Sequence, residues 1–155
     1  MRNPTIILLV LLGFIQSCSE STAPAGDELG ATVSYASGGF GPISNHMVIT
    51  MEGVVQAERI DRIAGTTHSA PWLQLSNTEI KELALLLEPF SDFDQFYEDP
   101  FAPTDGGSIH IALERAGATH EVTIYPADYD AVPIELKTLK TKLTELFAKA
   151  LANEH

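Results

Sequence analysis

Residues 108–125 have the sequence SIHIALERAGATHEVTIY, which contains the clearest pair of strands in the chain. Apolar and polar residues alternate in each half, so each half predicts a strand with one face on a core. The inward residues are expected to be Ile109, Ile111, Leu113, Val122 and Ile124. Residues 115–118 (RAGA) interrupt the alternation and predict a tight turn. The segment therefore predicts a β-hairpin.

A second hairpin is predicted upstream. Residues 31–37 (ATVSYAS) alternate, and residues 47–52 (MVITME) form the returning strand. Between them, residues 38–42 (GGFGP) hold three glycines and a proline, which predict a wide turn. Residues 53–70 are less regular: residues 54–63 could continue a bent strand, and residues 65–67 (GTT) are typical of a loop.

Two amphipathic helices are predicted. Ser76 and Glu79 have the spacing of a capping box, and Leu75 and Ile80 that of a hydrophobic staple. Pro89 should end this helix. The second helix is predicted to open at Pro133, which suits a first helical position. Its apolar stripe comprises Leu136, Leu139, Leu143, Leu146, Phe147 and Ala150.

Together these elements predict an α+β fold, in which a small antiparallel four-stranded sheet is covered by two helices in the order ββαββα. Residues 90–101 are expected to be irregular, with their aromatic rings docked on the core. Trp72 is expected in the core, with exposed recognition as the alternative.

The N-terminal segment is typical of a secretory signal. Arg2 supplies a positive charge, and residues 6–15 are almost continuously apolar but shorter than a membrane span. Residues 15–18 (IQSC) resemble a bacterial lipobox, although Gln16 is larger than usual. We therefore predict a signal peptide over residues 1–17, with Cys18 as the lipid-attachment site. The alternative is an ordinary secretory signal.

The predicted anchor divides the rest of the chain into a tether and a globular domain. Residues 18–30 are expected to form the lipidated cysteine and a flexible tether, and residues 31–155 the globular domain. Ser19 after the cysteine resembles an outer-membrane sorting signal, so the protein is expected to be lipid-anchored in the cell envelope, at the outer membrane if the host is diderm. Cys18 is the only cysteine, which excludes an intramolecular disulfide.

Composition and motifs argue against several functions. The formal net charge of -12 disfavours nucleic acid as a partner. Catalytic fingerprints for zinc proteases, serine hydrolases and nucleotide binding are absent from the sequence, so we expect no enzyme and no cofactor. His110 and His120 could form a metal pair, but their spacing favours exposed strand histidines. Residues 92–99 (DFDQFYED) could bind calcium, but their spacing favours a solvated acidic loop.

Several segments resemble the emfourin family, small protein inhibitors of thermolysin-like zinc metalloproteases. The resembling features, in order, are residues 37–43 (SGGFGPI), a helix followed by Phe93 and Phe96, residues 120–124 (HEVTI), and Asp130 with Pro133 before the last helix. The likeness covers residues 31–150. Two features depart from the family: residues 53–75 form a longer segment, and the familiar members lack a lipid anchor.

The resemblance implies a domain that binds a secreted or periplasmic metalloprotease and blocks its cleft. It places Gly38, Gly39, Phe40 and Ile43 at the protein-binding turn. Alternatively, the two glycines only shape the turn and Phe40 caps the core. The functional alternative is a non-inhibitory envelope lipoprotein with a structural or adaptor role, because a fold does not fix a function.

Overall fold

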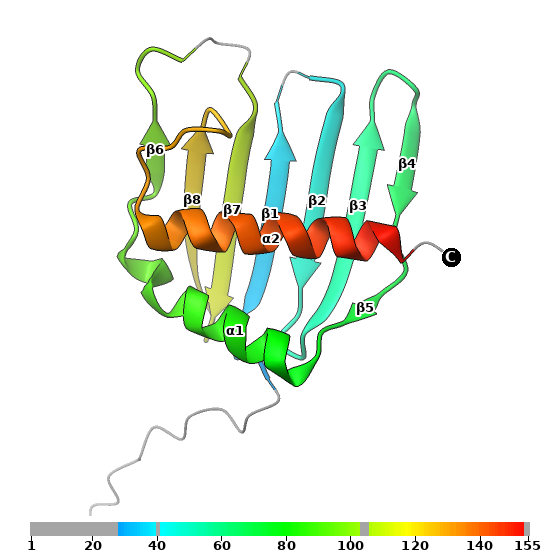
Figure 1. Cartoon of the computed structure of the whole chain (residues 1–155), viewed down its shortest axis with the longest axis vertical. Coiled ribbons are helices and arrows are strands. Elements are labelled where there is room, and N and C mark those ends of the chain that lie inside the picture. The colour runs from blue at the N-terminus through cyan, green and yellow to red at the C-terminus, as the bar shows by residue number, and fades with distance from the viewer. Residues whose placement is uncertain (1–27, 40, 103–105, 154–155) are drawn as a thin grey trace, which may run out of the picture.

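The computed structural model describes residues 28–39, 41–102 and 106–153. Cys18, with the predicted signal, and Phe40 lie outside these ranges. One sheet dominates the described part (Figure 1). Its strands are β1 Thr32–Gly38, β2 Ile43–Ile49, β3 Val54–Asp61, β4 Thr66–Ser69, β5 Leu73–Gln74, β6 Phe96–Glu98, β7 Ser108–Arg115 and β8 Ala118–Tyr125.

The predicted four-stranded antiparallel sheet in ββαββα order is wrong. The sheet is mixed and eight-stranded, in the order β4-β3-β2-β1-β7-β8-β6, with β5 also paired to β3. β6 runs parallel to β8, whereas the other neighbours are antiparallel. Of the added strands, β4, β5 and β6 are short, and burial imposes no alternation on exposed edge strands. All four residues of β4 are exposed, for example. β3 is long and internal, and it falls in the segment after residue 53 for which the sequence allowed a bent strand.

The two predicted hairpins exist. In the β7–β8 hairpin, Ala116 and Gly117 both take positive φ angles, 52° and 78°, as a two-residue turn of type I′ requires. The inward residues are buried as predicted: Ile109, Ile111, Leu113, Val122 and Ile124. In the upstream hairpin, β2 begins at Ile43, earlier than the predicted strand, so its turn is tighter than expected.

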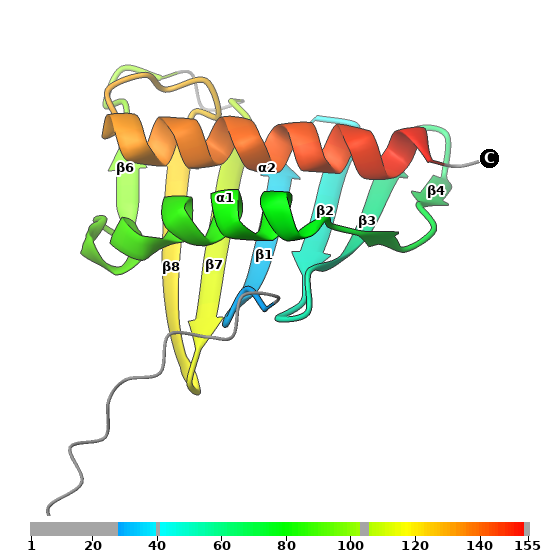
Figure 2. The same ribbon diagram turned by 60° about the horizontal axis from the view of Figure 1, so that its bottom comes forward.

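Helices α1 (Asn77–Leu87) and α2 (Ile134–Ala152) cover the same face of the sheet (Figures 1 and 2). A short 3₁₀ helix, η1 (Glu88–Asp92), follows α1 and contains Pro89. The whole predicted α2 stripe is buried: Leu136, Leu139, Leu143, Leu146, Phe147 and Ala150. α2 therefore lies across the strands and joins them into one core.

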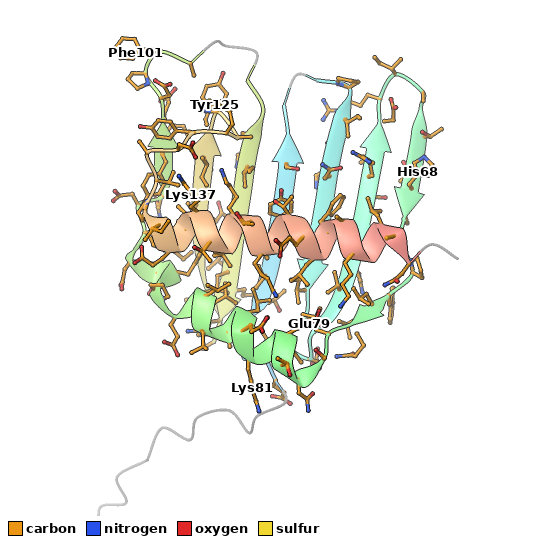
Figure 3. All side chains as sticks on the ribbon, in the orientation of Figure 1. His68, Glu79, Lys81, Phe101, Tyr125 and Lys137 are labelled. Carbon is orange, nitrogen blue, oxygen red and sulfur yellow. The ribbon has the colours of Figure 1, made fainter. Side chains whose placement is uncertain are left out.

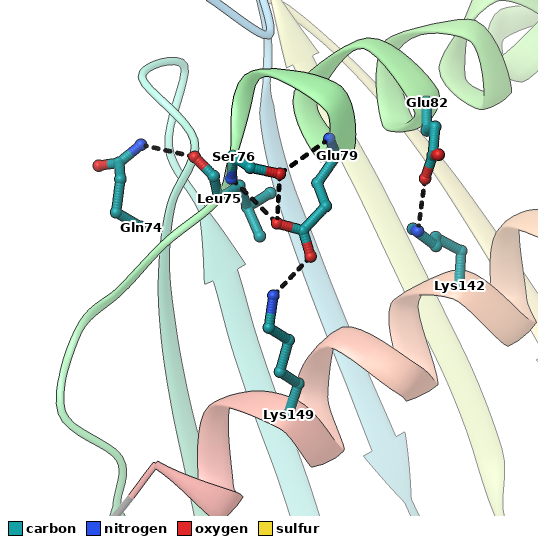
Figure 4. Close-up of polar contacts among 7 residues, drawn as sticks. All are labelled: Gln74, Leu75, Ser76, Glu79, Glu82, Lys142 and Lys149. Carbon is teal, nitrogen blue, oxygen red and sulfur yellow. Dashed lines mark hydrogen bonds and ion pairs between the residues drawn. The ribbon is translucent and has the colours of Figure 1, made fainter.

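The capping box of α1 is confirmed and is coupled to α2 (Figure 4). The Ser76 hydroxyl accepts from the Glu79 amide at 3.3 Å, and the Ser76 amide donates to the Glu79 carboxylate at 2.9 Å. The second oxygen of that carboxylate binds Lys149 of α2. A parallel ion pair joins Lys142 to Glu82 at 2.9 Å. Two lysines of α2 thus bind α1 through its acidic residues.

The aromatic residues follow the predictions only in part. Phe90 and Phe93 are buried as expected, but Phe96 is 57% exposed and Phe101 92% exposed. The preferred prediction for Trp72 is wrong, because its side chain is 76% exposed on the link between β4 and β5. β4, which precedes Trp72, is polar and exposed at all four residues, so it offers the indole ring no apolar surface.

The chain enters the fold at the lower edge of the sheet in Figure 1. Leu29 is 2% exposed, and its amide donates to the Met51 carbonyl at 2.7 Å. Folded structure therefore includes Leu29, which lies before the expected domain start at residue 31. Met51 belongs to the turn between β2 and β3, on the same edge as the β7–β8 turn.

A candidate binding edge

The opposite, upper edge of the sheet gathers four connections, which we call the loop edge. It comprises the described residues of 39–42, 62–65, 99–107 and 126–133. Strands β1, β3, β6 and β8 all run toward this edge, so the connections that follow them meet there (Figure 1). Loops held by a rigid sheet are common positions for binding residues.

The predicted turn is held on both sides by its neighbours. On one side, Arg62 donates from its backbone amide to the Pro42 carbonyl at 2.7 Å and from its guanidinium to the Gly39 carbonyl at 3.3 Å. On the other side, a Cβ atom added at Gly39 would lie 3.0 Å from the Gly107 Cα and 3.1 Å from the Gly106 carbonyl oxygen. Glycine at position 39 permits this close approach of two backbones.

Two connections of the loop edge each present a large apolar side chain to solvent. Ile63 is 85% exposed and Phe101 is 92% exposed. Figure 3 shows Phe101 projecting outward from the loop edge. Exposed apolar side chains at an ordered loop tip are suited to filling a pocket on a partner.

An aspartate orders each of these tips in the same way. Asp61 accepts hydrogen bonds from the amides of Ile63 and Ala64, both at 2.9 Å. Asp99 accepts from the Phe101 amide at 2.9 Å. Aspartates commonly organise turns through such short-range bonds to backbone amides. Both apolar residues therefore follow an aspartate that fixes the local backbone.

A hollow of about 620 Å³ opens beside Phe101, and its described lining comes from residues 99–102, 106–107 and 126–130. Gly107 lies in its wall, where its carbonyl accepts from the Ala127 amide at 2.6 Å. Asp130 also lines the hollow, and its ion pair with Lys137 at 3.0 Å lowers the pKa of its carboxyl group. The hollow gives the loop edge a concave part next to its most exposed ring.

The structure brings together those predicted site residues that it describes. Gly38 and Gly39 end β1 and begin the turn, and the Ser108 hydroxyl donates to the Gly38 carbonyl at 3.3 Å. Ile43 begins β2 and is 39% exposed, on the helix side of the sheet near Leu151. Phe40 and Cys18 lie outside the described residues. The functional roles of Ile63 and Phe101 were not predicted, because in the sequence their only signal is an aspartate two residues before each.

The candidate metal ligands do not converge. His110 and His120 lie on opposite faces of the sheet: the ring of His110 bonds Thr123 and Ser108 on the open side, and His120 contacts the Phe93 carbonyl on the helix side. Within residues 92–99, the Asp94 backbone amide donates a hydrogen bond to the Tyr97 hydroxyl at 3.0 Å. Across the described ranges, no three carboxylate, imidazole or thiol groups gather as a metal site.

No protein-family model and no curated protein matches the chain. Within the described residues, neither helix has the length and apolarity needed to cross a membrane.

Proposed function

We propose that this chain is a membrane-tethered, exported protein-binding domain whose loop edge inhibits a thermolysin-like zinc metalloprotease. One observation carries the proposal: the turn that resembles the emfourin turn is held between Arg62 and the backbone of Gly106 and Gly107. Ile63 and Phe101 add exposed apolar side chains on the same edge.

The geometry of the loop edge suits binding to a cleft. A protease cleft receives an extended segment with an apolar side chain in its main pocket, and binding is tighter when that segment is already ordered. Hydrogen bonds from Arg62, and those accepted by Asp61 and Asp99, fix the backbone at residues 39, 42, 63 and 101 before any partner arrives. Binding then loses little conformational entropy.

The position of the chain entry supports a tethered orientation. Leu29 lies beside Met51 at one end of the strands, and the loop edge lies at the other end. An eight-residue strand such as β3 spans about 26 Å. A lipid on Cys18 would therefore attach at the end of the domain far from the loop edge, which leaves that edge accessible to an exported partner.

The inhibition assay tests the binding proposal. A purified thermolysin-like metalloprotease is incubated with the full chain, and cleavage of a peptide substrate is followed. We expect the wild type to inhibit and Phe40→Ala to weaken inhibition about tenfold. Leu85→Ala is the matched control, because Leu85 is 64% exposed on α1, away from the loop edge. Unchanged potency of folded Phe40→Ala would remove the turn from the binding surface.

The anchor has a separate test. Cys18→Ser removes the thiol that would carry the lipid, so the protein should move from the membrane fraction to the soluble fraction. Mass spectrometry of the wild type should show acyl chains on Cys18, because more than one chain is needed for stable anchoring. A free thiol on a wild-type protein in the membrane fraction would contradict the anchor.

A further inference from the structure

The face of the sheet opposite the helices has a trough along β1. Figure 2 shows both helices on the other face, and the described elements leave this one uncovered. By the pairing register, β1 presents only small residues here, namely Thr32, Ser34, Ala36 and Gly38. Larger side chains flank it, including His46 on β2 and His110 on β7, which both pair with Ala36. We call this surface the open face.

The trough has the dimensions of an extended peptide. Its depression has a volume of about 350 Å³, and Ser34 and Ala36 lie in its floor. Glu121 on β8 lines one side. β1 has seven residues and therefore spans about 23 Å, which matches an extended segment of the same number of residues.

A second depression adjoins the trough and combines an aromatic ring with a carboxylate. It is lined by Trp72 and Glu58, and it shares His46 and Val48 with the trough. Trp72 is 76% exposed, so its ring is available to a ligand. An indole ring next to a carboxylate suits the cationic head of lysine or arginine, through cation–π attraction and ion pairing.

Charge is segregated between the two faces of the sheet. The open-face positions of the described strands include four glutamates and neither lysine nor arginine; the glutamates are Glu58, Glu98, Glu114 and Glu121. The described lysines lie on α1 and α2, where three of them form ion pairs. Ion pairs among the described residues involve none of the four open-face glutamates. The open face thus complements a positively charged partner.

We propose that the open face binds an extended, lysine- or arginine-bearing segment of a partner protein along β1, with one cationic side chain between Trp72 and Glu58. This surface is separate from the loop edge, so it gives the domain a second contact. Small side chains on β1 admit the backbone of the segment, and Glu121 lies on the other side of the trough from Glu58.

Trp72 is the only tryptophan in the chain, so its fluorescence reports on this site directly. The full chain, purified in neutral detergent at about pH 8, is titrated with the peptide KTKTKTK. The peptide ETETETE is the charge-reversed control. We expect a saturable change in Trp72 emission with the lysine peptide only.

Two double variants of equal net charge test where the peptide binds. Glu58→Gln with Glu121→Gln should raise the dissociation constant about fivefold, as expected for the loss of two partly solvated ion pairs. Glu135→Gln with Glu145→Gln changes exposed residues of α2 and should leave it unchanged. Three results would overturn the proposal. They are an equal rise in the dissociation constant for both double variants, binding of the glutamate peptide as well as the lysine peptide, or no saturable change in Trp72 emission. Protease inhibition should be the same in all these variants, which separates this test from that of the loop edge.

Discussion

Glu79 takes part in two interactions that hold α1 in place. Its carboxylate bonds Lys149 and the Ser76 amide, and these contacts lower its pKa from 4.5 to about 2. Because the folded-state pKa is depressed, the stabilisation is complete above about pH 4.5 and is lost as the pH falls toward 2.

Glu79→Gln should therefore lower the free energy of unfolding by about 1–2 kcal/mol at pH 7, after allowance for solvent screening. The difference from the wild type should shrink as the pH falls from about 5 to 2. Urea denaturation across this pH range measures it. Glu82→Gln, which breaks only the exposed pair with Lys142, is the control and should change stability by less than about 1 kcal/mol. A pH-independent difference for Glu79→Gln would contradict the assignment.

Gly39 and Gly41 lie in the same turn but have different surroundings. Gly39→Ala should destabilise the fold by about 1 kcal/mol, because its methyl group would press on the backbone of Gly106 and Gly107. Gly41→Ala should be nearly neutral, because an added Cβ atom there meets nothing within 4 Å. Thermal denaturation of the two variants compares them. Equal stability would show that the turn does not pack on Gly107.

At the scale of the elements, α2 buries six apolar residues, whereas α1 buries three. Leu139 is fully buried, so Leu139→Ala should lower the free energy of unfolding by about 2–5 kcal/mol. Leu85→Ala on α1 is the control, and its exposed side chain predicts a change of about 0.5 kcal/mol or less. Denaturant unfolding of both variants tests this difference, and a loss below about 1 kcal/mol for Leu139→Ala would contradict the packing.

The elements that the sequence predicts are those whose burial is periodic. Ile109, Ile111 and Leu113 alternate because one face of β7 lies on the core, and the α2 stripe repeats because one side of that helix does. β4 and β6 carry no such pattern, because these edge strands are defined by their pairing with β3 and β8 and not by burial of one face. The size of the sheet therefore could not be derived from periodicity.

The candidate site was predictable only in its local part. Residues 38–43 contain a turn that is predictable from their three glycines and one proline. Its contacts with Arg62 and Gly107 join residues distant in sequence, and they depend on the order of strands in the sheet. Trp72 shows the same limit, because its exposure follows from the polar edge strand beside it.

At the scale of the whole molecule, the sheet separates three surfaces. The helices close one face, the open face carries glutamates and Trp72, and the loop edge lies opposite the point where the chain enters. A tether at the entry would leave both the loop edge and the open face accessible. The proposed function requires that the loop edge binds and inhibits a metalloprotease.

The inhibition constant of one pair of double variants tests that claim most directly. Ile63→Asp with Phe101→Asp places charges on the loop edge, and Leu85→Asp with Ile134→Asp places the same charges on exposed positions of the helices. With a thermolysin-like metalloprotease, we predict that the helix variant inhibits like the wild type and that the loop-edge variant is at least about tenfold weaker. Equal inhibition by both variants, or a wild type that does not inhibit, would contradict the account.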